Sequence, residues 1–155
     1  MNEKERLSVF KVAPKAYQAM VQLEQAVRSL GLETKLYELT KIRASQVNGC
    51  AFCIDMHTQD ARAAGETEQR IYALNAWRET PFFSARERAA LSLTESITLV
   101  SETHVPDHIY AEAAAQFTET EIAALIMAIT TINAWNRIAI ASRTVAGTYK
   151  PIDHK

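Results

Sequence analysis

The two cysteines of the chain lie three residues apart, in the segment Cys50-Ala-Phe-Cys53-Ile-Asp-Met-His57. The preceding Asn48-Gly49 is typical of a turn, so a helix is predicted to begin here. On a helix, Cys50, Cys53 and His57 share one face. Free backbone N–H groups and the dipole stabilise a thiolate near a helix N-terminus, and in CxxC motifs a cysteine pKa can fall from ~8.5 to well below neutral. The segment therefore suggests a thiol redox site.

Redox catalysis is the first of three interpretations of this segment. One thiolate attacks an oxidant and becomes a sulfenic acid if that oxidant is a peroxide. The second thiol then condenses with it to a disulfide, and an external dithiol restores both thiols by exchange. His57, one turn beyond Cys53, is placed to take the first proton, directly or through one water.

A metal site is the second interpretation. Cys50, Cys53 and His57 offer three zinc ligands, and His104, His108 or a carboxylate could supply the fourth. Structural zinc usually draws its ligands from two segments of small, loop-rich modules, whereas this chain has no second cysteine pair. The third interpretation is that two buried cysteines and a surface histidine do no chemistry. A CxxC motif alone is only moderately specific, so all three stay open on the motif alone.

Length and composition favour one globular domain over residues 1–155, with no repeat or linker. The net charge of -1 gives no strong basic field that would attract nucleic acid or an anionic membrane. We expect no apolar stretch long enough to span a bilayer, and the charged N-terminus does not look like a signal peptide. A cytoplasmic protein is expected. There, thiols stay reduced, and a close cysteine pair is more often catalytic or metal-binding than a structural bridge.

The chain is predicted to be all-α, because only four glycines and four prolines interrupt its periodic segments. Capping boxes at Ser84-Ala-Arg-Glu87 and Thr118-Glu-Thr-Glu121 are expected to start two of the helices. The predicted helices run from about Pro14 to Leu30, from Glu33 to Val47, through the cysteine motif to near Gly65, from Glu68 to Trp77, after Ser84, from Pro106 to about Phe117, and from Thr118 through Ile140.

The last predicted helix is apolar around most of its circumference. Its apolar residues include Ile122, Leu125, Ile126, Ile129, Ile132, Trp135, Ile138 and Ile140. Such a helix is usually buried on all sides, and a small monomer has limited room for that. We therefore expect the chain to form a homo-oligomer, with this helix or its neighbours at the interface.

A wider pattern includes the cysteines. Glu38, Cys50, Cys53 and His57 together give E-x11-C-x2-C-x3-H. This pattern resembles the signature of the alkylhydroperoxidase D-like proteins, within the carboxymuconolactone decarboxylase superfamily. The resemblance covers roughly positions 38–143. Two further stretches are similar to that family: Glu87-Arg-Ala-Ala-Leu91 with Thr94-Glu95, and Ile132-Asn-Ala-Trp-Asn-Arg137.

The resemblance implies an all-α fold, obligate trimers or hexamers, and reduction of hydroperoxides by the cysteine pair without metal or other cofactor. Glu38 and His57 would form a proton relay, often with a bridging water, that deprotonates Cys53. Cys53 would attack the peroxide and Cys50 would resolve the product as a disulfide. A lipoyl group or a thioredoxin-like protein is the kind of external dithiol that would reduce it.

Some features depart from this pattern or allow another interpretation. Phe52 stands where a histidine can precede the second cysteine, which removes one proton shuttle and makes the pocket more apolar. The intact cysteine pair argues against lactone decarboxylation, because the decarboxylase branch does not rely on one. Cys50 lies nearer the helix start, so local physics favours its thiolate, whereas the family mechanism favours Cys53 as the attacking group. We take Cys53 as the attacking thiol.

Two charged side chains have plainer interpretations. Glu38 precedes Lys41 by three residues and could form a weak surface ion pair with it. Arg137 is expected to form an ion pair, for which Glu95 is a candidate partner. Two other functions also remain as alternatives: a thiol–disulfide oxidoreductase or redox sensor that does not reduce peroxide, and a helical oligomerisation module with an incidental or zinc-binding CxxC.

Overall fold

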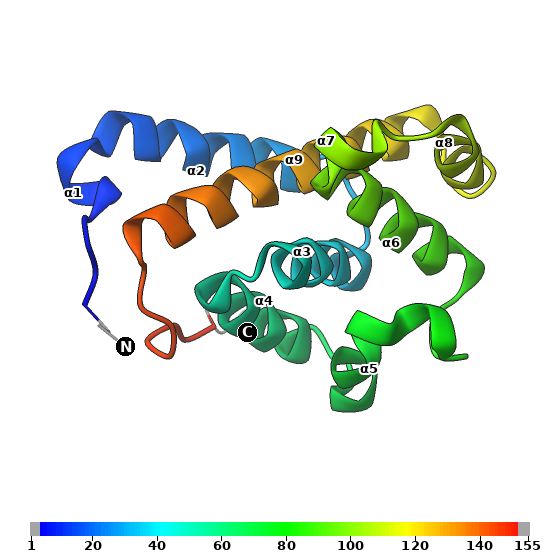
Figure 1. Ribbon diagram of the computed structural model, residues 1–155, viewed down its shortest axis with the longest axis horizontal. Coiled ribbons are helices and arrows are strands. Elements are labelled where there is room, and N and C mark those ends of the chain that lie inside the picture. The colour runs from blue at the N-terminus through cyan, green and yellow to red at the C-terminus, as the bar shows by residue number, and fades with distance from the viewer. Residues whose placement is uncertain (1–3, 152–155) are drawn as a thin grey trace.

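The computed structural model describes residues 4–151 and is all-α, with no strand among those residues (Figure 1). The all-α prediction is confirmed. The elements in chain order are α1 (Val9–Val12), α2 (Pro14–Arg28), α3 (Thr34–Asn48), α4 (Ala51–Ala63), α5 (Glu68–Ala73), the 3₁₀ helix η1 (Leu74–Glu79), α6 (Ala85–Thr98), α7 (Val100–Thr103), α8 (Asp107–Ala114) and α9 (Glu119–Ser142).

Helix α3 lies at the centre of the fold and packs against α4, α6 and α9. Figure 1 shows α2 and α9 running side by side along one edge, with α4 and α5 on the opposite side of α3. Leu39 and Ile42 of α3 have no exposed surface. The helix that carries Glu38 is thus the most enclosed one, and the cysteine helix α4 lies along it.

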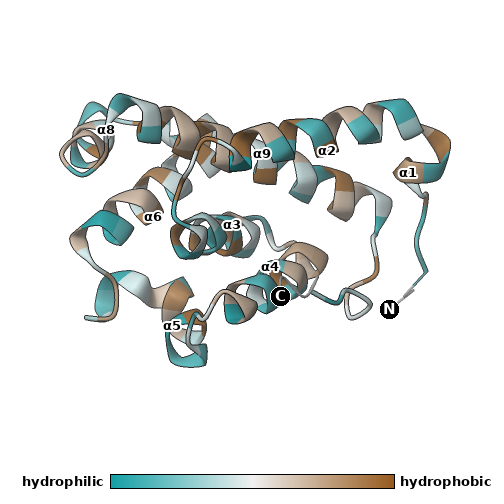
Figure 2. Ribbon diagram, turned by 180° about the vertical axis from the view of Figure 1, so that it is seen from behind, coloured by the Kyte–Doolittle hydropathy of each residue, from teal (hydrophilic) through white to brown (hydrophobic). Residues whose placement is uncertain are grey.

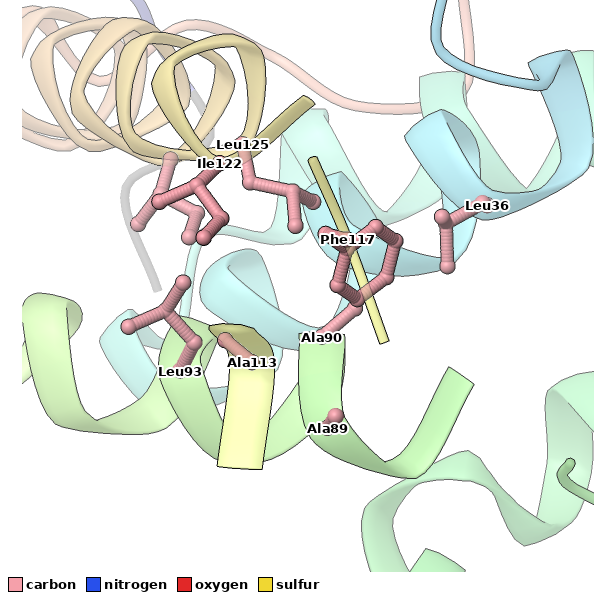
Figure 3. Packing of buried hydrophobic residues seen from close by; sticks show 9 residues of the cluster. Leu36, Ala89, Ala90, Leu93, Ala113, Phe117, Ile122 and Leu125 are labelled. Atoms are coloured by element: carbon pink, nitrogen blue, oxygen red, sulfur yellow. The ribbon is translucent and has the colours of Figure 1, made fainter. Parts of the chain in front are cut away.

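Two large apolar clusters fill the space around α3. The first joins α3, α6, α8 and α9 through side chains such as Leu36, Leu93, Ala113 and Leu125 (Figure 3). The second joins α3 to the segment from α4 to α6 and consists of Leu39, Ile42, Ala61, Ile71, Leu74, Trp77, Phe83 and Leu91. Full burial of one large apolar side chain contributes about 1.5–3 kcal/mol to stability, so these clusters hold α3 in place.

The helix boundaries agree well with local sequence signals. Both predicted capping boxes are confirmed, at Ser84 with Glu87 and at Thr118 with Glu121. Gly49 ends α3 with φ +70°, a left-handed conformation that glycine adopts without strain. The sharp turn predicted just before the first cysteine is therefore present.

Other elements differ from the prediction. The four-residue helices α1 and α7 were not expected, because four residues are too few to show an apolar period. The predicted helix Glu68–Trp77 is divided into α5 and the 3₁₀ helix η1, within which Ala76 has a non-helical φ of -116°.

Helix α9 is buried less completely than its composition suggested. Ile126, Met127 and Ile140 are exposed on the single chain, and Figure 2 shows apolar residues along the helix. Among the described residues, α9 is long and apolar enough to cross a membrane, so the expectation that the chain has no such stretch is wrong. However, 56% of the apolar 18-residue stretch in α9 is buried inside the fold, as in the core helix of a soluble protein.

Candidate active site

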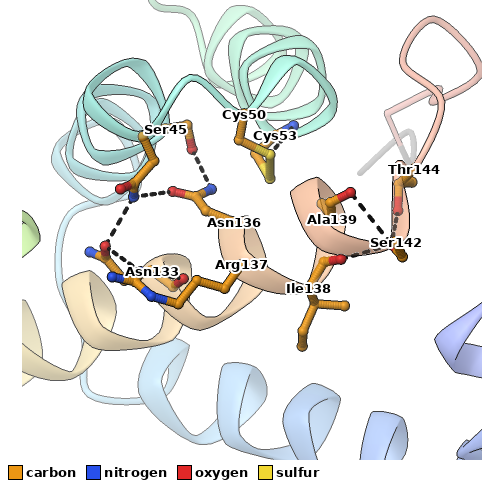
Figure 4. Close-up of a disulfide and its surroundings, with 11 residues drawn as sticks. Ser45, Cys50, Cys53, Asn133, Asn136, Arg137, Ile138, Ala139, Ser142 and Thr144 are labelled. Atoms are coloured by element: carbon orange, nitrogen blue, oxygen red, sulfur yellow. Dashed lines mark hydrogen bonds between the residues drawn. A yellow bond between two sulfur atoms is a disulfide. The ribbon is translucent and has the colours of Figure 1, made fainter. Parts of the chain in front are cut away.

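The cysteine pair occupies the first turn of α4. Cys50 is the N-cap residue, and its sulfur accepts a hydrogen bond from the backbone N–H of Cys53 at 3.4 Å. A disulfide joins the two residues, whose Cα atoms are 5.4 Å apart, within the usual range for a bridge (Figure 4). The spacing that suggested a redox pair thus brings the two sulfurs together.

The disulfide is enclosed by apolar side chains. Cys50 is 1% exposed and Cys53 is 2% exposed. They pack with Ala44, Ile132 and Ala139, and Phe52 and Trp135 lie against the same cluster. Burial of this kind disfavours a thiolate, so a nearby base is needed to remove a proton from either thiol.

Glu38 and His57 form a buried pair between α3 and α4. His57 Nδ1 lies 2.8 Å from Glu38 Oε2, and Arg28 Nη2 donates to Glu38 Oε1 at 3.0 Å. Glu38 is 1% exposed and His57 is 3% exposed. The alternative of a surface pair between Glu38 and Lys41 is therefore wrong.

This geometry assigns the two nitrogens of His57 different roles. A carboxylate at Nδ1 holds the proton there in the neutral ring, which leaves Nε2 as an acceptor. His57 follows Cys53 by four residues on α4, so the two side chains share one face. Burial alone would raise the pKa of Glu38, but the hydrogen bond from His57 and the positive charges of Arg28 and Lys41 hold it below its usual value. Glu38 is thus an anion at neutral pH.

A second charge pair, partly buried, lies beside the first, between α2 and α3. Lys41 has no exposed surface, and both its ammonium group and the Tyr37 hydroxyl donate to Glu24 Oε1. Burial lowers the pKa of Lys41, and the attraction of Glu24 opposes that effect only in part. Arg28 and Lys41 both lie over the Tyr37 ring, at 4.8 and 4.6 Å from its centroid. This pair could not be predicted from the sequence, because its two members are 17 positions apart and form no local pattern.

Among residues 4–151, one group has the geometry to hold a cation: ligand atoms of Glu38, His57 and Asp60 lie within 4.8 Å of one another. Each already has a protein partner. Glu38 binds Arg28 and His57, and the Tyr149 hydroxyl donates to Asp60 Oδ1 at 2.7 Å. The hydrogen bonds of these residues are thus made to protein groups, with Glu38 and His57 bonded to each other and Asp60 bonded to Tyr149.

The zinc set considered from the sequence does not form in this structure. Cys50 and Cys53 are bonded to each other, and His104 and His108 do not belong to the one group of described residues with metal-site geometry. The two cysteines thus form a disulfide in this structure, whereas zinc binding would need them as separate thiolates.

The expected pairing of Arg137 with Glu95 is wrong. Glu95 accepts hydrogen bonds from Arg43 at 2.7 Å, from Trp77 at 2.8 Å and from Arg78 at 2.5 Å. Arg137 donates instead to the backbone and side-chain oxygens of Asn133 on its own helix.

Comparison with known proteins identifies the family of the chain. Residues 14–96, more than half of the chain, match the model of the carboxymuconolactone decarboxylase family. The uncharacterized protein YdfG of Bacillus subtilis (strain 168) is 47% identical over 137 residues, which cover 88% of this chain and 93% of YdfG. The chain belongs to the carboxymuconolactone decarboxylase family.

Solved structures of similar proteins confirm the fold. A protein of unknown function from Agrobacterium tumefaciens, suggested to be the antioxidant defence protein AhpD, has a TM-score of 0.91 and 40% identity, covering 94% of this chain and all of that one. The debrominase Bmp8 has a TM-score of 0.79 and 19% identity, with 87% of this chain and 73% of Bmp8 covered, so it shares the fold alone. The resemblance to alkylhydroperoxidase D-like proteins is thereby confirmed.

Proposed function

We propose that this member of the carboxymuconolactone decarboxylase family is a thiol peroxidase that reduces hydroperoxides through Cys50 and Cys53. The proposal depends on one observation. The Cys50–Cys53 disulfide lies in the first turn of α4, and His57 lies in the next turn, with its Nδ1 bound to the buried Glu38. The similar protein suggested to be the antioxidant AhpD gives independent support.

The proposed cycle starts from the dithiol form. His57 Nε2, directly or through one water, takes the proton of the Cys53 thiol. The thiolate attacks the distal oxygen of the hydroperoxide, the O–O bond breaks, and the alkoxide leaves as an alcohol with the proton from His57. Cys53 becomes a sulfenic acid. The Cys50 thiol then attacks the Cys53 sulfur, which forms the disulfide and releases water.

Cys53 is the proposed attacking thiol because it stands one helical turn from His57, whereas Cys50 stands two turns away. Cys50, at the N-cap, is the resolving thiol. Glu38 keeps the histidine proton at Nδ1 and stabilises the imidazolium that forms when Nε2 takes the thiol proton. The cycle uses no metal or flavin.

Regeneration needs two electrons and two protons from an external dithiol, which leaves as a disulfide. Both sulfurs are almost fully buried in the single chain. We therefore favour a slender reductant such as a dihydrolipoyl group over the broad surface of a thioredoxin-like protein. The burial of the two sulfurs also favours a small oxidant such as a hydroperoxide.

We further propose a cytoplasmic homo-oligomer, a trimer or hexamer. Exposed Ile126, Met127 and Ile140 on α9 support the association, because apolar side chains gathered on a helix surface gain free energy when a partner covers them. We propose no nucleic-acid or membrane partner.

The decisive assay follows consumption of an organic hydroperoxide by the fully reduced protein, with dihydrolipoamide as reductant. Catalytic consumption that is lost in Cys53→Ser supports the proposal. A protein that exchanges its disulfide with dithiols but consumes no hydroperoxide would instead be a thiol–disulfide oxidoreductase or redox sensor.

A further inference from the structure

Helix α9 buries two asparagines beside the disulfide, although it is otherwise mainly apolar (Figure 4). Asn133 is 9% exposed and Asn136 has no exposed surface. A buried amide without hydrogen bonds costs stability, so these side chains need partners. Two of these partners, Ser45 and Asn48, lie just before the cysteine motif in the chain.

One side chain of α3 joins both asparagines. Asn48 Nδ2 donates to Asn133 Oδ1 at 2.9 Å and to Asn136 Oδ1 at 2.8 Å. Asn136 Nδ2 in turn donates to the hydroxyl of Ser45 at 3.0 Å. Two residues in the last turn of α3 are thus tied to α9.

The direction of these hydrogen bonds follows from a backbone group. Asn133 Nδ2 faces the carbonyl oxygen of Ile129 at 2.9 Å, and a carbonyl can only accept. Asn133 must therefore present its Oδ1 to Asn48, and Asn48 must present its Nδ2. Because Asn48 Nδ2 is a donor, it must face the Oδ1 of Asn136. The Nδ2 of Asn136 is then left to donate to the Ser45 hydroxyl. The network has one consistent arrangement.

The network holds the turn that delivers Cys50. Asn48 is the last residue of α3, Gly49 follows with φ +70°, and Cys50 comes next. The backbone N–H of Cys50 donates to the carbonyl of Ser45 at 2.9 Å. Both residues that anchor this turn are therefore bonded to α9, whereas Cys53 is carried by α4.

We propose that Asn48, Asn133 and Asn136 are positioning residues that keep the sulfur of Cys50 within bonding reach of Cys53 when the pair is reduced. They raise the effective concentration of one thiol at the other and so favour the disulfide over the dithiol. The use of this effect in a peroxidase cycle rests on the proposed function. The dithiol–disulfide equilibrium itself can be measured without it.

The test equilibrates the full-length protein with mixtures of reduced and oxidised dithiothreitol. Reduction of the Cys50–Cys53 bond transfers two electrons and two protons from one dithiothreitol, which becomes its cyclic disulfide. Mass spectrometry of thiol-blocked protein gives the equilibrium constant. Asn48→Ala is expected to shift it about fivefold toward the dithiol, as loss of hydrogen bonds of ordinary net strength implies.

Thr98→Val is the matched control. Thr98 Oγ1 accepts from Asn133 Nδ2 at 3.0 Å, at the end of the network away from Asn48. This variant also removes a buried hydrogen bond but leaves the ties to Asn48 in place. Its equilibrium constant is expected to stay within about twofold of wild type.

A purely structural role gives a different result. A variant that weakens the folded dithiol and disulfide forms equally lowers Tm without moving the equilibrium between them. The proposal is overturned if folded Asn48→Ala has the equilibrium constant of wild type, or if Thr98→Val shifts that constant by as much as Asn48→Ala does. If Asn48→Ala does not fold, Ser45→Ala is tested in its place, and its equilibrium constant is expected to shift about threefold toward the dithiol. An unshifted equilibrium constant in Ser45→Ala overturns the proposal.

The exchange experiment contains no hydroperoxide, so its outcome is separate from that of the proposed function. A shifted equilibrium in a protein that consumes no hydroperoxide supports the positioning role and refutes the peroxidase. Hydroperoxide consumption with an unshifted Asn48→Ala equilibrium refutes the positioning role alone.

Discussion

Replacement of Glu38 by glutamine tests the proton relay with a nearly isosteric change. The carboxylate binds His57 Nδ1 at 2.8 Å and Arg28 at 3.0 Å. The amide of glutamine can still accept one of these hydrogen bonds but carries no charge. His57 would then lose the anion that stabilises its protonated ring during proton transfer.

The size of the effect follows from the geometry. A hydrogen bond that involves a charged group has a net value of about 1.5–3 kcal/mol, and each 1.36 kcal/mol in a barrier changes a rate tenfold. If the 2.8 Å contact contributes in the transition state, the reaction of Cys53 with hydroperoxide slows about 10- to 100-fold in Glu38→Gln.

The assay is rapid mixing of the reduced protein with an organic hydroperoxide, followed by quenching with a thiol-blocking reagent and mass spectrometry. Glu66→Gln is the control, because Glu66 is also a buried glutamate, 2% exposed, with an arginine partner, Arg70, at 2.9 Å. A Glu38→Gln rate within about twofold of wild type, or an equal loss in Glu66→Gln, refutes the relay.

Three other predictions follow from the same geometry. In Cys50→Ser a sulfenic acid is expected at Cys53 after peroxide treatment, detected with a dimedone-type probe; trapping only in Cys53→Ser contradicts the assignment. Lys41→Met should lower the free energy of unfolding in urea by about 1–3 kcal/mol, because the partly buried Glu24 loses its cation. Adding Glu24→Leu should recover part of this loss. The pKa of Glu38 is lower in the folded state than in the unfolded state. The ionised carboxylate therefore stabilises the fold above its unfolded pKa of about 4.3, and this stabilisation is lost as the pH falls through the folded pKa. Glu38→Gln should lose less stability than wild type on acidification below about pH 5, and the same dependence of stability on pH in both proteins contradicts this.

The features that could be predicted from the sequence are local ones. The capping boxes at Ser84 and Thr118 depend on residues three positions apart, and Gly49 ends its helix through its own backbone freedom. The cysteine spacing likewise placed both sulfurs in one helical turn. The pairing of Glu38 with His57 came from the family resemblance, since no local rule connects residues 19 positions apart.

The features that could not be predicted depend on how helices pack. Lys41 looked like a surface partner of Glu38, but α3 lies at the centre of the fold and turns Lys41 toward Glu24 on α2. Asn48 and Asn136, 88 positions apart, meet only because α3 and α9 pack together. Composition showed that α9 is apolar but not which of its faces the single chain leaves exposed.

The most direct test of the central claim is a count of blocked thiols per chain, made on reduced protein before and after one equivalent of organic hydroperoxide. The chain has two cysteines, so the proposed cycle predicts two blocked thiols before treatment and none after, with both restored by dihydrolipoamide. Two blocked thiols that persist after the peroxide would contradict the cycle, because the Cys50–Cys53 disulfide would then not be a product of peroxide reduction.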